Sequence, residues 1–375
     1  MKVVVVSGIW PPDVGGPASH APEVADFLHE RGHAVEVVTT AWAPPAERAY
    51  TVTAVPRSLP PGVRHLRGAA LVRERARRAD AVYTTGMFGR SFAGATAAGR
   101  PYVLKLTADP AFERARRRGI VAGDVDAFQG KRRGVRVALL RLARDVELRQ
   151  AAHVFCPSDY LRTLTIAWGV PAARVSVLPN PAPRLPELAP RGELRRSFGM
   201  NGMTLAFAGR LTAQKSLGLA LEAVAAVDGV TLLIAGDGER EPVEQRAREL
   251  ALGSRVRFLG AQPRDRVLEL FRAADASILS SSWENFPHTV VEALAVGTPV
   301  IATAVGGVVE VVHDGENGLL VPPGDGAALA DAVRRYVSDD ALRERLRAAA
   351  AGSVRDLDRD AVFGRIEHAL TEAVS

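Results

Sequence analysis

The sequence contains only one cysteine, Cys156, among its 375 residues. A single cysteine excludes an internal disulfide framework and any metal site built from several thiolates. No apolar run reaches the length of about 20 residues that a membrane-spanning helix needs. The opening residues MKVVVVSGIWPPD carry an apolar run that is too short for a signal peptide, so we expect a cytoplasmic protein that begins with a buried strand.

Lysines and aromatic residues are also scarce. Only four of the 48 basic residues are lysine, and aromatic residues make up 6% of the chain. Arginine is therefore common everywhere, and its abundance alone says little about function. The one strongly basic stretch is 111–149, with 11 Arg and Lys against five Asp and Glu. It lacks the interleaved aromatic residues that stack on bases, so we expect no nucleic-acid partner.

What the sequence does contain is two series of short apolar runs that alternate with amphipathic segments. The first series covers 2–6, 34–39, 80–84, 101–106, 152–156 and 174–178. The second series covers 203–208, 230–235, 255–259, 275–280 and 299–303. These runs are continuous, which is typical of parallel strands that are buried on both faces. Two such series predict an α/β protein with two doubly wound, Rossmann-like domains.

The domain boundary is expected at the segment PNPAPRLPELAP, residues 179–190, because its five prolines disfavour both helix and central strand. We therefore expect one domain at 1–182 and a second at 183–354. The last segment, 355–375, has the apolar spacing of an amphipathic helix that can lie against either domain.

Two glutamates follow the expected strand 275–280. Glu284 falls in the loop at the carboxyl end of that strand, where doubly wound sheets bind ligands. We expect a helix over 287–296 with Pro287 in its first turn, which places Glu292 in the second turn. The helix N-terminus, which attracts phosphate, then lies between the two carboxylates. This order matches the sugar, diphosphate and ribose of a nucleotide sugar, although a helix-start charge and a solvated face fit the same pattern.

A second set of residues follows the first strand of the second series. Gly209 allows a tight turn, and Arg210 and Lys215 stand on either side of it. Arginine offers a planar fork to phosphate oxygens and lysine a compact charge, so the pair fits a diphosphate. In the first loop of the chain, Gly15 and Gly16 permit a close approach of the backbone to a ligand. That loop does not match Gly-x-Gly-x-x-Gly, so dinucleotide binding gains no support.

Together these motifs resemble those of the retaining glycosyltransferases of family 4, which have the GT-B fold. The resemblance rests on Glu284-Asn-Phe-Pro-His-Thr-Val-Val-Glu292, Gly209-Arg210-Leu-x3-Lys215, Gly236-Asp-Gly238, Gly297-Thr-Pro-Val-Ile-Ala and Gly306-Gly307-Val-Val-Glu310. It covers about 200–325, and the Gly15-Gly16 pair extends it into the first domain. Gly236-Asp-Gly238 alone is a weak signal, since a turn that closes a strand explains it equally well.

The resemblance implies two Rossmann-like domains with the active site in the cleft between them, the donor on the second domain and the acceptor mainly on the first. Arg210 and Lys215 are then expected to bind the donor diphosphate, Glu284 the sugar hydroxyls and Glu292 the ribose. The other expected donor-binding positions are Gly15, Gly16, Gly209, Gly238, Asn285, Phe286, Pro287, His288 and Thr289. No metal and no cofactor are expected, because the cations and the helix N-terminus stabilise the leaving nucleoside diphosphate. The final helix, 355–375, is expected to pack back on the first domain.

The sequence departs from the family after the strand at 101–106. Many members place a histidine there, whereas this chain reads LTADPAFERA. Asp109 is the candidate catalytic residue of this loop, as a general base or as a group that orients the acceptor or the donor sugar. The same aspartate also fits a helix N-cap, because Pro110 follows it as a first-turn residue. Both interpretations stay open at this point.

Other readings remain for the partners. Segment 111–149 fits three interpretations. It can contact the inner face of an anionic membrane peripherally, it can attract an acidic acceptor, or it can be a solvated basic surface. A nucleotide-sugar 2-epimerase or hydrolase, or a phosphorylase, has the same double-Rossmann plan. The resemblance favours a UDP-linked hexose as the donor, with a GDP-linked hexose as the alternative. The acceptor hydroxyl belongs to an unknown molecule: a lipid-linked glycan, a polysaccharide or a small natural product.

Overall fold

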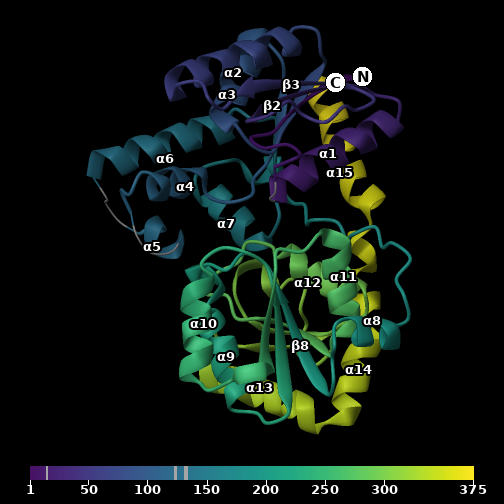
Figure 1. Ribbon diagram of the computed structural model, residues 1–375. Coiled ribbons are helices and arrows are strands. Elements are labelled where there is room, and N and C mark those ends of the chain that lie inside the picture. The colour runs from purple at the N-terminus through teal and green to yellow at the C-terminus, as the bar shows by residue number, and fades with distance from the viewer. Residues whose placement is uncertain (14–15, 122–124, 131–133) are drawn as a thin grey trace. The chain divides into compact units, whose positions relative to one another are not determined.

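The computed structural model describes residues 1–13, 16–121, 125–130 and 134–375 of the chain. These residues form two compact units (Figure 1). Unit 1 comprises 1–180 together with 360–375, and unit 2 comprises 181–359. The bounds lie within five residues of those that the sequence suggests, and the proline-rich residues 178–190 form neither helix nor strand.

Unit 1 contains a seven-stranded parallel sheet in the order β3-β2-β1-β4-β5-β6-β7. Its strands are β1 (Lys2–Val6), β2 (Ala34–Ala41), β3 (Thr51–Pro56), β4 (Ala81–Thr84), β5 (Tyr102–Lys105), β6 (His153–Cys156) and β7 (Val175–Val177). The helices are α1 (Gly16–Glu30), α2 (Pro61–Ala76), α3 (Phe88–Ala98), α4 (Pro110–Arg117), α5 (Val125–Gln129), α6 (Gly134–Arg149), α7 (Asp159–Ala167) and α15 (Arg359–Val374).

The first strand shows why its apolar run is continuous. Val3 and Val5 pack into one buried cluster, and Val4 and Val6 pack into another. The first cluster contains side chains of α1 and α15, and the second contains side chains of α2, α3, α6 and α7. Both faces of β1 are therefore covered by helices, as the sequence predicts. The final helix belongs to unit 1, where Phe363 and Ile366 are fully buried.

Unit 2 repeats the plan with a six-stranded parallel sheet in the order β10-β9-β8-β11-β12-β13. Its strands are β8 (Met203–Ala208), β9 (Val230–Ala235), β10 (Val256–Gly260), β11 (Ala276–Leu279), β12 (Val300–Thr303) and β13 (Gly318–Val321). Its helices are α8 (Arg191–Ser197), α9 (Leu217–Ala225), α10 (Arg240–Glu249), α11 (Arg264–Ala273), α12 (His288–Ala295), α13 (Gly326–Ser338) and α14 (Asp340–Ala350). The two parallel α/β sheets confirm the predicted fold class.

Two strands of the structure are absent from the sequence prediction, β3 and β13. Each lies at an edge of its sheet and pairs with one neighbour only. β3 is partly exposed and ends in a proline that a central strand does not accommodate, whereas β13 is mostly buried but only four residues long. None of the helices formed by the described residues is both long and apolar enough to cross a bilayer.

Candidate functional site

The chain reverses its winding direction in unit 2 between β8 and β11. The strands lie side by side, with Leu205 opposite Ala276, and the connections leave them toward opposite edges of the sheet. Ligands of doubly wound sheets bind at the carboxyl ends of such strands. The residues that directly follow β8 are 209–215, with Gly209, Arg210 and Lys215, and those that directly follow β11 are 280–287, with Glu284; Glu292 comes later, on the next helix.

The Lys215 ammonium forms an ion pair with the Glu284 carboxylate, although the two residues are 69 positions apart. Their side chains are only 16% and 9% exposed. The Ser281 hydroxyl donates to Glu284 Oε1 at 2.6 Å, and the Ser280 hydroxyl donates to the backbone carbonyl of Lys215 at 2.9 Å. The loop after β8 and the loop after β11 are thus joined by polar contacts, and a charged pair is fixed at the edge of the sheet.

The backbone of Glu284 is held from a third loop. Gly306 begins the short 3-10 turn after β12 and has a φ of +47°. A Cβ at this position would lie 1.7 Å from the Glu284 carbonyl oxygen, so only glycine fits. The Gly307 amide donates to the Asn285 carbonyl at 3.0 Å. The Gly306-Gly307 motif therefore has a local explanation, since it lets one loop support the backbone that carries Glu284.

The Gly209 and Gly238 motifs meet where the loops after β8 and β9 lie against each other. The Gly209 amide donates to the carbonyl of Ala235 at 3.0 Å, and the Leu211 amide donates to that of Asp237 at 2.7 Å. A Cβ at Gly238 would lie 2.5 Å from the carbonyl oxygen of Leu211. This contact is a structural reason for the second glycine of Gly236-Asp-Gly238. The position of Gly238 beside the loop of Arg210 keeps it near the predicted donor site.

Glu292 lies on α12 and is largely buried. The Arg264 guanidinium, at the first residue of α11, donates to Glu292 Oε1 at 3.1 Å. The helix begins at His288, so Pro287 is its N-cap and not a first-turn residue as the sequence suggested. Proline has no polar side chain, and none caps this end from the N-cap position. The first-turn amides at His288 and Thr289 therefore receive no cap from Pro287.

Phe286 is buried in the core of unit 2, where it anchors the loop before α12. Arg210, by contrast, is exposed and forms no hydrogen bond or ion pair within the described part of the chain. The site thus presents one unengaged guanidinium, one lysine paired with a carboxylate, and a helix N-terminus. Such a combination suits a ligand with an anionic centre and flanking hydroxyl groups.

Asp109 in unit 1 is fully buried and caps α4. Its Oδ1 accepts from the Ala111 amide at 2.8 Å, and its Oδ2 accepts from the Arg144 guanidinium and the Gln129 amide, each at 2.9 Å. Both oxygens are occupied within the unit, so the geometry favours the capping interpretation over the general base. A carboxylate without exposed surface does not contact an acceptor in this arrangement.

Gly15 lies outside the described residues. Gly16 is the first residue of α1. Two residues of the site were missed from the sequence, Ser281 and Arg264. Ser281 is the second residue after the end of β11, and Arg264 opens a helix after β10, so their place at strand ends was the available signal.

Two family profiles match the chain. The profile "Glycosyl transferases group 1" matches residues 193–352, and the profile "Glycosyltransferase Family 4" matches residues 14–183. The D-inositol 3-phosphate glycosyltransferase of Actinosynnema mirum is 36% identical over 215 residues, which are 52% of this chain and 51% of that protein. The phosphatidyl-myo-inositol mannosyltransferase of Mycobacterium leprae is 39% identical over 171 residues, 44% of this chain and 45% of that protein. The chain thus spans about half the length of these relatives.

A solved structure resembles the whole chain. The structure of HepE of Anabaena in complex with UDP-glucose superposes on this chain with a TM-score of 0.80. The superposition covers 99% of this chain and 100% of the HepE chain. The sequences are 22% identical, so the likeness shows a shared fold and does not by itself show a shared substrate.

Proposed function

Because the chain belongs to the family 4 glycosyltransferases of the GT-B fold, we propose that it moves a hexose from a nucleotide sugar to an acceptor hydroxyl. The observation that carries the proposal is the Lys215–Glu284 pair beside the N-terminus of α12, at the carboxyl edge of unit 2. UDP is the preferred nucleotide and GDP the alternative. The complex of HepE with UDP-glucose supports this donor class.

The contacts of Glu284 suggest how the donor is divided among the side chains. Lys215 and Ser281 both contact Oε1, so within the described chain Oε2 is left to accept from a sugar hydroxyl. Lys215 is held in place by the same contact and presents its charge to the diphosphate. Arg210 has the unengaged guanidinium that can bind phosphate oxygens in a bidentate way. Glu292 accepts from the ribose hydroxyls, with Arg264 as a positioning residue.

The reaction we propose proceeds with retention of configuration at the anomeric carbon. As the bond from that carbon to the phosphate oxygen breaks, the nucleoside diphosphate gains negative charge. Arg210, Lys215 and the N-terminus of α12 stabilise this charge without reorganising. The acceptor hydroxyl attacks from the face that the leaving group occupied, and a phosphate oxygen takes its proton. We expect turnover to be unchanged by EDTA, since these groups supply the positive charge.

The donor is identified by a thermal-shift panel of UDP, GDP, UDP-glucose and GDP-mannose. At a given concentration, a ligand that binds the native state more tightly raises the melting temperature further. We expect the UDP compounds to raise it more than the GDP compounds. If none of the four ligands shifts the melting temperature, the assignment of unit 2 to a nucleotide sugar is wrong.

Product analysis separates transfer from the related reactions of the same fold. An epimerase or hydrolase releases the nucleotide at full rate without an acceptor, whereas a transferase depends on one. A phosphorylase carries a pyridoxal group that a simple absorbance scan detects. We expect slow release of nucleotide from the donor alone and faster release once a suitable acceptor is present.

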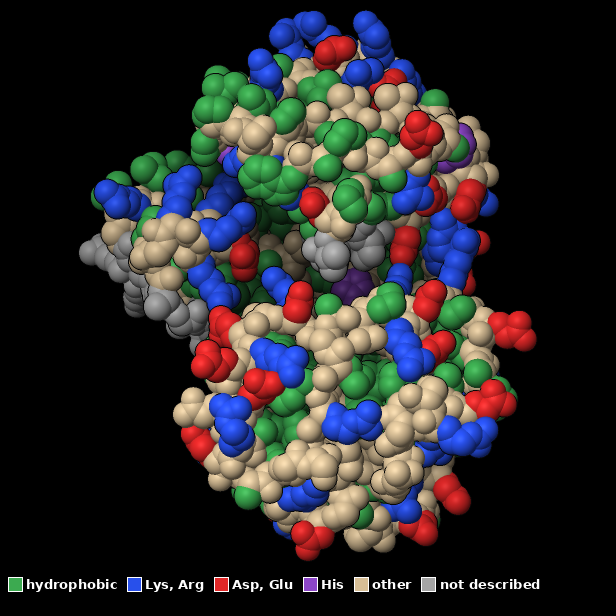
Figure 2. All heavy atoms as spheres, in the orientation of Figure 1, with side chains coloured by type: hydrophobic (Ala, Val, Ile, Leu, Met, Phe, Trp, Pro, Cys, Tyr) green, Lys and Arg blue, Asp and Glu red, His purple; other side chains and the backbone are tan. Residues whose placement is uncertain are grey.

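We also propose that unit 1 contacts an anionic membrane through α6. Exposed apolar residues recur on this helix at positions 135, 139, 142 and 146, the spacing of one helical face. Leu139 and Leu142 are each 59% exposed. Figure 2 shows hydrophobic and basic side chains close together in this part of unit 1, and Arg136 is exposed beside the apolar stripe. Such a helix lies in the interface with its apolar face among the lipids.

Cosedimentation with vesicles tests this contact. The variant with Leu139→Ser and Leu142→Ser is expected to bind phosphatidylglycerol vesicles several-fold more weakly than the unaltered protein, because two apolar anchors are lost. Leu185→Ser, at an exposed leucine of the proline-rich residues 178–190, is the matched control and should bind normally. Equal sedimentation of all three proteins would contradict a role of α6 at the membrane.

A further inference from the structure

Unit 1 contains a cavity of about 1030 Å³ that no step of the donor chemistry uses. It opens at the carboxyl edge of the sheet, beside the β1–β4 pair, where the winding of unit 1 changes direction. Gly8 and Thr85 line it from just beyond the ends of these two strands, and Thr40, Arg57 and Thr107 line it from neighbouring strand ends. This is the position at which a doubly wound sheet binds its ligand.

The lining of the cavity is strongly basic. It contains six arginines and two glutamates: Arg57, Arg64, Arg90, Arg114, Arg117, Arg118, Glu113 and Glu147. Arg114 is neutralised by a bidentate contact with Glu147, with a shortest distance of 2.8 Å, and Arg57 by Asp13 at 2.8 Å. Arg64 and Arg90 have no carboxylate partner among the described residues. Arg117 and Arg118 have none there either, so four of the six arginines of the lining lack a carboxylate partner within the described chain.

Two polar groups at the cavity are buried without a hydrogen-bond partner in the described chain. They are Nη1 of Arg90 and Oγ1 of Thr85, a residue only 1% exposed. Leaving a buried polar group unpaired costs about 1–3 kcal/mol. Burial lowers the pKa of Arg90 to about 10, and repulsion from Arg64, Arg114 and Arg57 adds to this effect. An anion beside Arg90 would relieve both the missing hydrogen bonds and the repulsion.

The start of α3 adds backbone donors to the same wall. Its N-cap residue, Met87, has a φ of +57° and offers no side-chain cap to the first turn. Phe88 and Gly89, the first two residues of the helix, line the cavity together with Met87. Uncapped first-turn amides favour an anion, and here they lie next to the arginines that favour it too.

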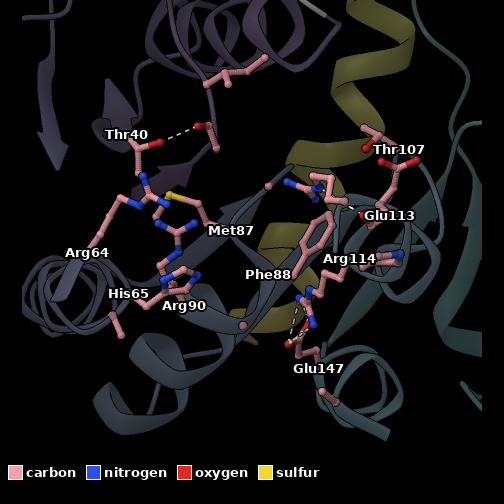
Figure 3. A pocket seen from close by; sticks show the side chains of 18 of the residues that line it. Thr40, Arg64, His65, Met87, Phe88, Arg90, Thr107, Glu113, Arg114 and Glu147 are labelled. Carbon is pink, nitrogen blue, oxygen red and sulfur yellow. Dashed lines mark hydrogen bonds and ion pairs between the residues drawn. The ribbon is translucent and has the colours of Figure 1, made fainter. Parts of the chain in front are cut away.

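The opposite wall has a different character. Figure 3 shows Arg64, His65 and Arg90 on one side of the cavity and Glu113, Arg114 and Glu147 on the other. Glu147 is engaged by Arg114, whereas the Glu113 carboxylate has no partner within the described residues. A free carboxylate is an acceptor for hydroxyl groups. The cavity therefore suits a molecule with an anionic group at one end and hydroxyl groups at the other.

We propose that this cavity binds the acceptor, and that the acceptor carries a phosphate group, held by Arg90, Arg64, the Thr85 hydroxyl and the first amides of α3. This inference rests on the proposed function, because it names the substrate class that the transferase glycosylates. The phosphate belongs to a soluble phosphomonoester or to a lipid headgroup. Glu113 accepts from hydroxyl groups of the same molecule.

Calorimetry with inorganic phosphate, in the presence of saturating UDP, measures the anion site while the donor site is occupied. We expect Arg90→Gln and Arg64→Gln each to weaken phosphate binding about tenfold or more, as loss of a charge-assisted hydrogen bond does. Arg100→Gln, just beyond the other end of α3 and exposed, is the matched control and should bind like the unaltered protein. Arg90→Lys should restore part of the affinity, and melting curves show whether each variant folds.

The results separate the two proposals. Phosphate binding that is absent, or equal in all variants that fold, overturns the anion site whether or not UDP binds. Absence of UDP binding in the unaltered protein overturns the proposed function, and with it the assignment of the cavity to an acceptor. Unchanged UDP affinity in Arg90→Gln, together with lost phosphate affinity, is the expected result.

The source of the phosphate is identified by turnover. Glycerol 1-phosphate and vesicles of phosphatidylglycerol are offered as acceptors with the same donor, and free glycerol is the neutral comparison. Faster transfer to either phosphate compound than to glycerol supports the inference, and the faster of the two identifies the soluble or the lipid source. Transfer to glycerol at an equal or higher rate than to both phosphate compounds would overturn it.

Discussion

Lys215 is the residue on which the donor chemistry depends most directly. Lys215→Ala removes the cation that faces the leaving diphosphate, so we expect turnover to fall by about a hundredfold or more, as for loss of one preorganised group in a site of this kind. Lys215→Arg keeps a charge and should retain more activity. Arg248→Ala removes an exposed arginine of α10 in the same unit and serves as the control. Full activity of Lys215→Ala, in protein with a normal melting curve, would remove Lys215 from the mechanism.

Lys105 is a buried cation outside the donor site. It is 1% exposed, and its ammonium donates to Asn180 Oδ1 at 2.9 Å and to the Pro179 carbonyl at 3.3 Å. Burial lowers its pKa from 10.5 to about 7. Between these two values the unfolded chain binds more protons at this site than the folded chain, so this lysine makes stability rise with pH above about 7.

The pH dependence of unfolding tests the Lys105 argument. The melting temperature of the unaltered protein should rise relative to that of Lys105→Met as the pH increases from 7 toward 9.5, below the range in which tyrosines titrate. At lower pH both folded and unfolded Lys105 are charged, so the difference between the two proteins should level off. Parallel curves throughout this window would show that the folded lysine keeps an ordinary pKa.

At the scale of secondary-structure elements, the contact between α11 and α12 supports the ribose end of the site. Glu292→Ala should weaken binding of the donor and of the free nucleotide to a similar degree, because both carry the ribose. Arg264→Ala leaves the carboxylate in place but less well oriented, so we expect the same pattern with a smaller loss. Calorimetry with UDP and UDP-glucose measures both. A variant that changes only the KM of the acceptor would contradict the assignment of Glu292.

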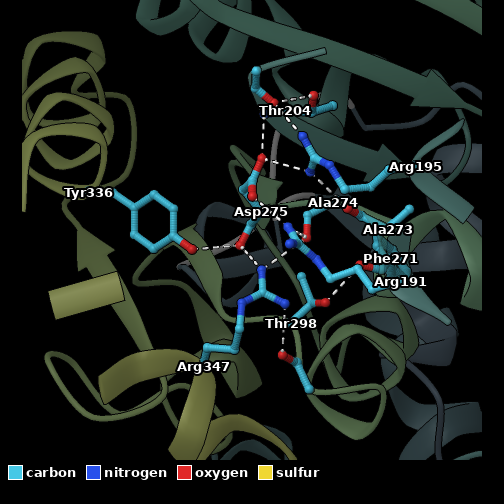
Figure 4. Close-up of polar contacts among 12 residues, drawn as sticks. Arg191, Arg195, Thr204, Phe271, Ala273, Ala274, Asp275, Thr298, Tyr336 and Arg347 are labelled. Atoms are coloured by element: carbon cyan, nitrogen blue, oxygen red, sulfur yellow. Dashed lines mark hydrogen bonds and ion pairs between the residues drawn. The ribbon is translucent and has the colours of Figure 1, made fainter. Parts of the chain in front are cut away.

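The amino ends of the strands in the sheet of unit 2 carry a polar network that we assign to stability (Figure 4). Asp275 directly precedes β11 and accepts from the guanidinium groups of Arg191 and Arg195, at 2.5 and 3.1 Å, and from the Thr204 amide at 2.8 Å. Its backbone carbonyl accepts from the Tyr336 hydroxyl at 2.5 Å. These contacts join α8, β8 and α13 to the amino end of β11, away from the donor-binding edge.

Asp275→Asn keeps the shape of the side chain but removes the charge that two arginines share. We expect a loss of about 1–3 kcal/mol in the free energy of unfolding, with no change in nucleotide affinity. Asp331→Asn is the control and should melt normally, because this aspartate is 73% exposed and, among the described residues, pairs with Arg334 alone. Denaturant unfolding and UDP titration provide the two readouts. Reduced UDP affinity in folded Asp275→Asn would contradict the separation of the two edges.

The buried elements could be predicted from the sequence because burial on both faces leaves a continuous apolar run. β1 and β8 have the bounds that the sequence predicts, since nearly every residue in them faces a core. β3 was missed because most of its residues are exposed or half-buried, and β13 because its run, although mostly buried, is only four residues long. The helix α12 begins one residue later than predicted, since Pro287 occupies the N-cap position just before it.

The candidate site could be located but not assembled from the sequence. Strand ends are readable, so Lys215 and Glu284 could be assigned to loops at the carboxyl edge. Their mutual contact depends on β8 and β11 being neighbours across 69 residues, which no local pattern specifies. The capping of α4 by Asp109 was one of two open readings, and only its burial against Arg144 distinguished them.

At the scale of the whole molecule, each unit repeats one design: a parallel sheet with a polar site at the carboxyl edge, where the winding reverses. In unit 2 the site combines Lys215, Glu284 and the N-terminus of α12. In unit 1 the cavity combines Arg90, Thr85 and the N-terminus of α3. The same backbone plan thus supplies two basic ligand-binding edges in one chain, which we propose serve the donor and the acceptor.

The most direct test of the account is a crystal structure of the protein with UDP-glucose. It should show the diphosphate within hydrogen-bond distance of Lys215 and Arg210, the glucose hydroxyls on Glu284, and the ribose hydroxyls on Glu292. A nucleotide sugar bound elsewhere, or bound here with Lys215 and Glu284 still paired only to each other and out of its reach, would contradict the account.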